Sequence, residues 1–115
     1  MYVVWLEVLA DPEATDDDFC EAAERFRNSA QSDWLRTGFP RWYHDDAALD
    51  VLTHLASRDR EHDLATSSAA ETLVFVWMQK GAVDRDRFAK LCDPARDVVF
   101  SYLEMNRPDL LEGLS

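Results

Sequence analysis

The chain has 115 residues, a length that fits one domain and allows about two-thirds of the unfolded chain's surface to be buried. Hydrophobic residues make up 47% of it and include six Phe, four Trp and three Tyr, a composition that argues against global disorder. Its 23 Asp and Glu against 12 Lys and Arg give a formal net charge of −11, which repels phosphate backbones and argues against direct binding to nucleic acid.

The sequence also favours a particular compartment. No run of 18 apolar residues is present to span a bilayer, and residues 2–9 lack the basic region and cleavage site of a signal peptide. Cys20 and Cys92 fall within helical patterns at positions typical of buried small hydrophobic residues, as free thiols often do in reducing compartments. We therefore expect a cytoplasmic protein with no disulfide and no membrane contact.

Helical spacing dominates the chain. Three Gly and four Pro leave few residues for hairpin turns, and apolar residues recur mostly at three- and four-residue steps. We predict an all-α fold in which residues 1–115 form one compact bundle of five to seven helices. Residues 2–9 could be helix or strand, because Tyr2, Trp5 and Leu9 keep helical spacing whereas the three valines suit a strand equally well.

The second predicted helix begins with a run of acids. Thr15 precedes Asp16, Asp17 and Asp18, which predicts an N-cap with carboxylates in the first turn. Five apolar residues then line one face of this helix: Phe19, Ala22, Ala23, Phe26 and Ala30. The three aspartates are compatible with two roles, a favourable interaction with the helix dipole and contact with a partner.

The segment Asp33–His44, with the sequence DWLRTGFPRWYH, interrupts the helical pattern at Gly38 and Pro40. We predict a loop whose aromatic residues Trp34 and Phe39 turn toward the core. Trp, Tyr and Arg are the residues that dominate binding energy at protein interfaces. The members of this segment that we expect to contact a partner are Arg36, Arg41, Trp42 and Tyr43.

Two further helices follow. Asp45 or Asp46 is expected to cap a helix whose three leucines face the core, and the charged residues 58–63 form a turn. From Leu64 to Lys80 the chain is helical again and becomes apolar on all sides, with Gly81 as its C-terminal stop. A helix of that kind is usually surrounded by others, so we predict that it is the central element.

The C-terminal third carries the clearest capping signals. Asp84 is positioned to cap a short helix, and Asp93 with Pro94 predicts an N-cap followed by proline at the first helical position. Asn106 is a candidate left-handed cap for this last long helix, and Pro108 begins a final short turn.

Two of these helices share an apolar pattern. Residues Ala65, Ala69, Ala70 and Leu73 have the same offsets as residues Ala95, Val99, Phe100 and Leu103. Arg96 supplies a basic residue directly after the first position of the second copy. Over residues 47–106 this pattern resembles HEAT-like helical repeats, which implies stacked helical hairpins that present a surface to a partner and perform no catalysis. An irregular helical bundle is the alternative.

Chemistry-bearing residues form no recognisable set. Asp50 and His54 lie one helical turn apart and could chelate a metal, or they could form an exposed helical pair. No serine stands in a Gly-x-Ser-x-Gly elbow, and three scattered glycines do not form a loop that binds phosphate. We therefore expect no catalytic residue, no metal and no cofactor, and a protein that is not an enzyme.

The acidic charge is concentrated near the N-terminus. Residues 1–30 hold eight Asp and Glu against Arg25 and Arg27, a net charge of −6. The candidate binding residues on this helix are Asp16, Asp17, Asp18, Glu21 and Glu24. An acidic face of this kind attracts a protein partner with a basic surface, and proteins that bind nucleic acid must expose Lys and Arg.

These features lead to three hypotheses. The first is a non-catalytic module that inhibits a nuclease or other nucleic-acid-processing enzyme, similar in size and charge to immunity proteins, anti-CRISPR proteins and DNA mimics of bacteria and phages. The second is a helical adaptor or regulatory subunit that binds through the aromatic and Arg residues of the segment Asp33–His44. The third is a small enzyme with an unrecognised carboxylate site.

Overall fold

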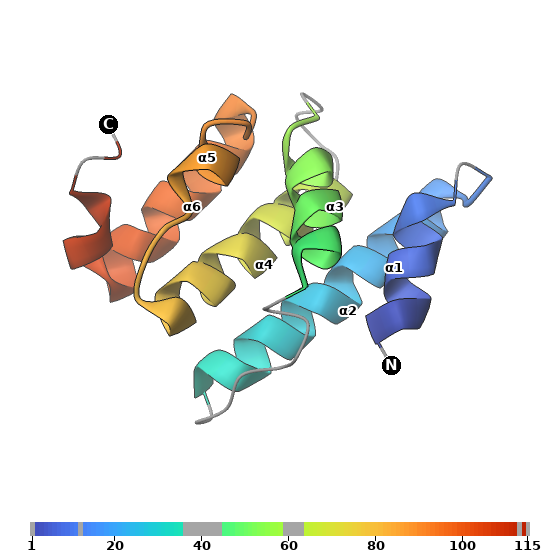
Figure 1. The fold of residues 1–115 in the computed structure, drawn as a ribbon, viewed down its shortest axis with the longest axis horizontal. Helices are drawn as coiled ribbons and strands as arrows, with labels where there is room; N and C mark the ends of the chain where they lie inside the picture. The colour runs from blue at the N-terminus through green and yellow to red at the C-terminus, as the bar shows by residue number, and fades with distance from the viewer. Residues whose placement is uncertain (1, 12, 36–44, 59–63, 113, 115) are drawn as a thin grey trace.

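The computed structural model describes residues 2–11, 13–35, 45–58, 64–112 and 114 (Figure 1). The described residues form no strand and confirm the all-α prediction. The elements are α1 (Tyr2–Ala10), α2 (Asp16–Leu35), α3 (Asp46–Ala56), α4 (Leu64–Lys80), α5 (Arg85–Phe88), α6 (Asp93–Asn106) and a 3-10 helix, η2 (Pro108–Leu111).

The N-terminal segment is a helix, which decides between the two structures that its sequence allows. The rings of Trp5 in α1 and Phe26 in α2 pack edge to face with centroids 5.2 Å apart. Leu9 is buried in the same core. Helical spacing places these apolar side chains on the side that faces α2, where a strand would have no partner among the surrounding helices.

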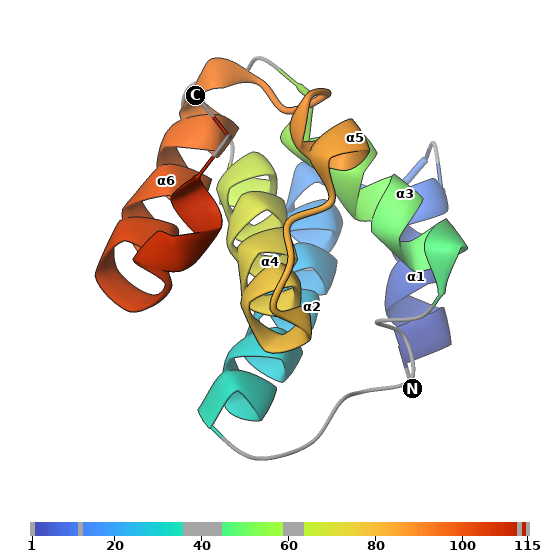
Figure 2. The ribbon, with the colours of Figure 1, turned by 60° about the vertical axis from the view of Figure 1, so that its left-hand side comes forward.

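The helices form two layers, and α4 is the central helix of the first layer (Figures 1 and 2). In one layer α4 lies between α2 and α6 and contacts both. In the other layer α3 contacts both α1 and α5. The packing of α1 on α2 and of α3 on α4 joins the layers. α1 lies at one end of the molecule with the first turns of α2 beside it (Figure 1).

The central position of α4 follows from its composition, as predicted. Every residue from Thr72 to Met78 is buried. The hydroxyl of Thr72 donates to the carbonyl of Ser68 at 2.7 Å, so burial leaves this polar group bonded. Across the interface α3 buries the three leucines that the sequence assigned to the core, Leu49, Leu52 and Leu55.

Three of the predicted helix boundaries are confirmed by their hydrogen bonds. The carboxylate of Asp45 accepts from the amide of Ala47 at 3.0 Å and caps α3. The carboxylate of Asp84 accepts from the amide of Arg87 at 3.2 Å and caps α5. Gly81 ends α4 with a φ of 75°, and its amide donates to the carbonyl of Trp77 at 2.8 Å.

The start of α6 differs from the sequence-based prediction. Cys92, not Asp93, is the N-cap, and its side chain makes no capping hydrogen bond. Asp93 is the first helical residue, so Pro94 occupies the second helical position. The reason is a long-range contact, because the amide of Cys92 donates to the carbonyl of Ala56 at the end of α3 (3.0 Å) and holds Cys92 in an extended conformation.

The end of α6 differs as well. Asn106 belongs to the helix, and no described residue other than glycine has a positive φ, so the predicted left-handed cap is wrong. The amide of Arg107 instead donates to the carbonyl of Leu103 at 2.7 Å. The guanidinium of Arg107 reaches the carbonyl of Met78 in α4 at 3.1 Å, which joins the ends of the two helices.

The helix α2 continues to Leu35 and thus includes the first three residues of the segment Asp33–His44, which we predicted to be a loop. The remainder of that segment lies outside the described residues. The roles predicted for Arg36, Arg41, Trp42 and Tyr43 therefore stay predictions.

Replacing Gly81 with alanine tests the stop of α4. A Cβ at this position would have Arg107 Nη2 as its nearest neighbour, at 4.0 Å, so space is available and only the left-handed backbone is unfavourable. We expect Gly81→Ala to lower the free energy of unfolding by about 1 to 2 kcal/mol, measured by urea denaturation. Ala82→Ser, a change at the exposed next residue, is the control. Equal stability of Gly81→Ala and the wild type would contradict this account.

Candidate protein-binding surface

The helix α2 presents a row of carboxylates on the side that faces away from the core. Asp17, Asp18, Glu21 and Glu24 are all exposed, and we call these four residues the acidic face. Asp17, Glu21 and Glu24 follow one another at steps of four and three residues, which places them on one stripe of the helix. The opposite stripe contains the buried residues Ala23, Phe26 and Ala30.

One member of the acidic face also begins the helix. The amide of Asp18 donates to Thr15 Oγ1 at 3.1 Å, and Asp18 Oδ2 accepts from the amide of Thr15 at 3.3 Å. This reciprocal pair is a capping box, and it confirms the prediction that Thr15 caps α2. Asp18 thus has a structural role besides its charge, while α2 begins at Asp16, whose side chain lies outside the described part.

The two arginines of α2 differ in their contribution to this charge. Arg25 lies 3.5 Å from Glu21, in a pair whose side chains are 59% and 67% exposed and which therefore adds little stability. Arg27 points away from the acidic face, and its Nε lies 3.6 Å from Glu71 of α4. The outer side of α2 is consequently more acidic than the sequence count suggests.

A groove of about 250 Å³ runs between α1 and α2 beside the acidic face. Apolar side chains from both helices line it, and three charged residues of α2 border it: the full set is Val4, Trp5, Val8, Asp18, Glu21, Ala22 and Arg25. Val3 and Val4 on α1 remain 50% and 60% exposed. The sequence analysis did not identify this surface. The signal that could have shown it is the composition of α1, in which Glu7 is the one charged residue among nine.

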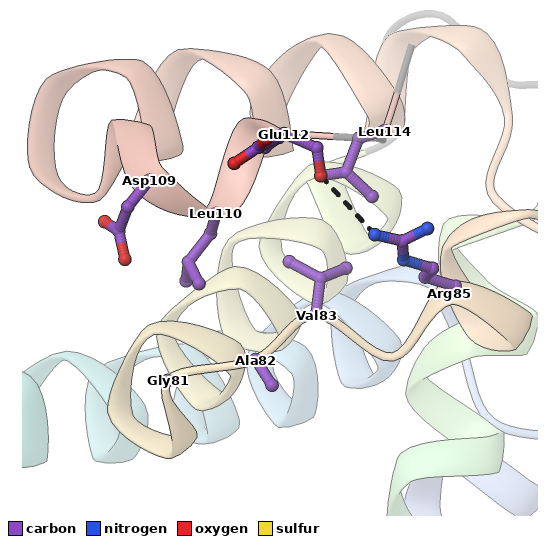
Figure 3. A pocket seen from close by; sticks show the side chains of 8 residues that line it. All are labelled: Gly81, Ala82, Val83, Arg85, Asp109, Leu110, Glu112 and Leu114. Atoms are coloured by element: carbon purple, nitrogen blue, oxygen red, sulfur yellow. Dashed lines mark hydrogen bonds between the residues drawn. The ribbon is translucent and has the colours of Figure 1, made fainter.

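A larger hollow of about 450 Å³ lies between the end of α4 and η2 (Figure 3). Two of its charged side chains, Arg85 and Asp109, form hydrogen bonds. Arg85 Nη2 donates to the backbone carbonyl of Glu112 at 3.4 Å, and Asp109 accepts two hydrogen bonds from Arg107, at 2.9 and 3.1 Å. These hydrogen bonds lower the pKa of Asp109 and raise that of Arg107, so both groups stay charged.

Arg87 is the centre of a second charged cluster. Its guanidinium lies 2.6 Å from Asp84, 2.9 Å from Asp50 and 3.3 Å from Asp46, and so connects α3 with the start of α5. Burial alone would raise the pKa of Asp84, but hydrogen bonds from the backbone and side chain of Arg87 outweigh it and lower this pKa. Burial alone would lower the pKa of Arg87, but hydrogen bonds to Asp84 and Asp50 and the charges of these two carboxylates outweigh it and raise this pKa.

This cluster bears on the metal site considered for Asp50 and His54. Asp50 accepts a hydrogen bond from Arg87, so its carboxylate serves an ion pair. His54 is exposed and lines a hollow of about 270 Å³ together with Asp50 and Lys90. Within the described residues, no group of three His, Cys, Asp or Glu is arranged to hold a metal ion.

Glu71 is a carboxylate whose side chain is only 24% exposed. It lies between Arg27 of α2 and Tyr102 of α6, whose hydroxyl forms a hydrogen bond with it. Burial raises the pKa of Glu71, and the charge of Arg27 and the bond from Tyr102 only partly offset this effect. Burial also raises the pKa of Tyr102, with a further contribution from the Glu71 charge. Glu71 lines none of the hollows described above, so we assign it to the joining of three helices.

No known protein family, curated protein or solved structure matches this chain. Among the described helices, none combines the length and the apolar character needed to cross a membrane. The class that fold and surface define is therefore a two-layered all-α protein with an acidic face and an apolar groove at its N-terminal end.

The raised pKa of Glu71 predicts how stability changes with pH. The contribution of Glu71 is fully present below its ordinary pKa of 4.5 and is lost as the pH rises through the raised value of the folded chain. Glu71→Gln cannot ionise. We therefore expect the stability of this variant relative to the wild type to increase between about pH 4 and pH 7, measured by urea denaturation.

Arg27→Gln is the companion variant, because it removes the charge that lowers the pKa of Glu71. It should make the loss of stability with rising pH steeper. If the difference between Glu71→Gln and the wild type were constant over this range, burial would not control the carboxylate.

Proposed function

We propose that this protein is a non-catalytic, cytoplasmic module that binds a basic protein surface and thereby inhibits a nucleic-acid-processing enzyme. The observation that carries the proposal is the acidic face. Its carboxylates are exposed on the outer side of α2, and the charge of Arg27 is directed to Glu71 on the other side of that helix. A surface of this kind competes with phosphates for Lys and Arg side chains.

The packing of α2 supports the same proposal. Phe26 and Ala30 are fully buried, and α2 makes its most extensive contacts with the central helix α4. The acidic face therefore stands on a helix whose backbone is fixed before a partner arrives. Fixed charges increase the association rate, and a preformed surface reduces the entropy lost on binding.

The resemblance to HEAT-like repeats remains part of the proposal. At three of its four equivalent positions the residues are buried in both helices, namely Ala65, Ala69, Leu73, Ala95, Val99 and Leu103; at the fourth, Ala70 is buried and Phe100 is partly exposed. The two helices that carry them, α4 and α6, lie side by side, and α3 and α5 lie in the other layer. In a stack of helical hairpins, α1 and α2 would form a terminal unit with an open outer side.

Removing two charges of the acidic face tests the inhibitor hypothesis. Asp17→Asn with Glu24→Gln avoids Asp18, whose carboxylate caps α2. The first step is a pull-down from the organism's own lysate at low and high salt, with mass spectrometry of the retained proteins. The activity of a retained nuclease or helicase is then measured with wild-type protein and the variant. We expect the inhibition constant to weaken about tenfold at low salt, with a smaller salt dependence.

The matched control removes the same charge elsewhere. Asp97→Asn with Glu104→Gln changes two exposed residues of α6, on the far side of α4 from α2. This variant should inhibit like the wild type. The proposal fails if both variants inhibit equally well, or if no nucleic-acid-processing enzyme is retained. A partner that resists high salt would instead favour the adaptor hypothesis.

A further inference from the structure

The helix α1 exposes more apolar surface than its position at the edge of the fold explains. Its nine residues include one charged side chain, Glu7. The helix packs against α2 and α3, which cover one side of it, but Val3 and Val4 remain half exposed or more. A helix that is apolar on nearly all sides is normally covered on all sides. The outer side of α1 is thus a surface without a partner among the described elements.

The groove between α1 and α2 combines this apolar surface with charge. Val4 and Val8 of α1 lie along one side of it, Ala22 of α2 contributes from the other side, and Asp18, Glu21 and Arg25 border it. The groove is therefore apolar inside and carries one net negative charge along the α2 edge, where Arg25 forms only an exposed pair with Glu21 at 3.5 Å. The complementary shape is an amphipathic helix with an apolar stripe and Lys or Arg beside it.

Other occupants fit less well. A second copy would bring two acidic faces together in a chain of net charge −11, and like charges that approach closely repel each other. An anionic membrane surface is repelled for the same reason. The volume of about 250 Å³ is below the roughly 300 to 1,000 Å³ typical of pockets for small molecules.

We propose that the groove between α1 and α2 receives a basic amphipathic helix of the partner protein. Its apolar side chains cover Val4 and Val8, and its Lys or Arg side chains pair with Asp18 and Glu21. The nine residues of α1 span about 13 Å at 1.5 Å per residue, so two to three turns of the partner helix match its length. The inference rests on the proposed function, because it names the part of the basic partner that binds beside the acidic face.

Three synthetic peptides of equal length serve as probes. The first is an amphipathic helix of Leu and Lys, the second replaces every Leu with Ser, and the third replaces every Lys with Gln. Binding of each labelled peptide to the full chain is measured by fluorescence anisotropy at low and high salt. We expect the Leu/Lys peptide to bind at least tenfold more tightly than either of the others, because each lacks one of the two complementary features.

Two neighbouring valines provide a matched pair of variants. Val4 lines the groove, whereas Val3 is exposed on the same helix but does not line it. Val4→Ser should weaken binding of the Leu/Lys peptide about tenfold, and Val3→Ser should leave it unchanged. Val4→Lys should weaken it further, because it places a like charge in front of the basic helix. Circular dichroism checks that each variant folds.

The outcomes separate this inference from the proposed function. If the Leu/Lys and Ser/Lys peptides bind equally, and only Asp17→Asn with Glu24→Gln weakens them, the groove is not used but the acidic face still binds. If the Leu/Gln peptide binds as tightly as Leu/Lys and the charge variant has no effect, both proposals fail. A dimer in sedimentation analysis that Val4→Ser dissolves would assign the groove to a second copy and overturn the inference. Binding of no probe would also overturn it.

Discussion

The helix α4 buries every residue from Thr72 to Met78, and a helix with this composition is stable in water only when other helices cover it. The arrangement of the remaining elements follows from that requirement. α2 and α6 cover α4 within its own layer, and α3 covers it from the other layer. Each covering helix needs one apolar stripe, and its opposite side is then free to be polar.

The acidic face is a consequence of this arrangement, in which each covering helix has one apolar side and one side that is free to be polar. α2 uses Phe26 and Ala30 to cover α4, so the other side of the helix faces solvent and can carry Asp17, Glu21 and Glu24 without a cost of burial. α1 is in a different position, because it covers α2 and α3 but is itself covered on one side only. The same geometry that stabilises α4 thus leaves an acidic helix and an apolar helix beside each other at one end of the molecule.

The sequence predicts the features that depend on neighbouring residues. The bounds of α4, the caps at Asp45 and Asp84 and the stop at Gly81 agree with the structure, because each is determined within one or two turns. The start of α6 was predicted one residue late. It depends on the distant carbonyl of Ala56, which no local pattern contains.

The same distinction between local and long-range features applies to the candidate site. The acidic residues of α2 were identified from the sequence, since helical spacing alone places Asp17, Glu21 and Glu24 on one stripe. The direction of Arg27 and the groove beside α1 were not identified. Both depend on how two helices pack against each other, α2 on α4 for Arg27 and α1 on α2 for the groove, which no local pattern contains.

The hydrogen bond between the Cys92 amide and the Ala56 carbonyl also bears on dynamics. It connects the last residue of α3 with the N-cap of α6, while α4 and α5 lie between them in the chain. The amide hydrogen of Cys92 can exchange with solvent only when this contact opens. Opening it separates the end of α3 from the start of α6, the two points between which the chain forms α4 and α5. The exchange rate of the Cys92 amide therefore reports whether the C-terminal half unfolds as one cooperative unit or gradually, beginning at η2.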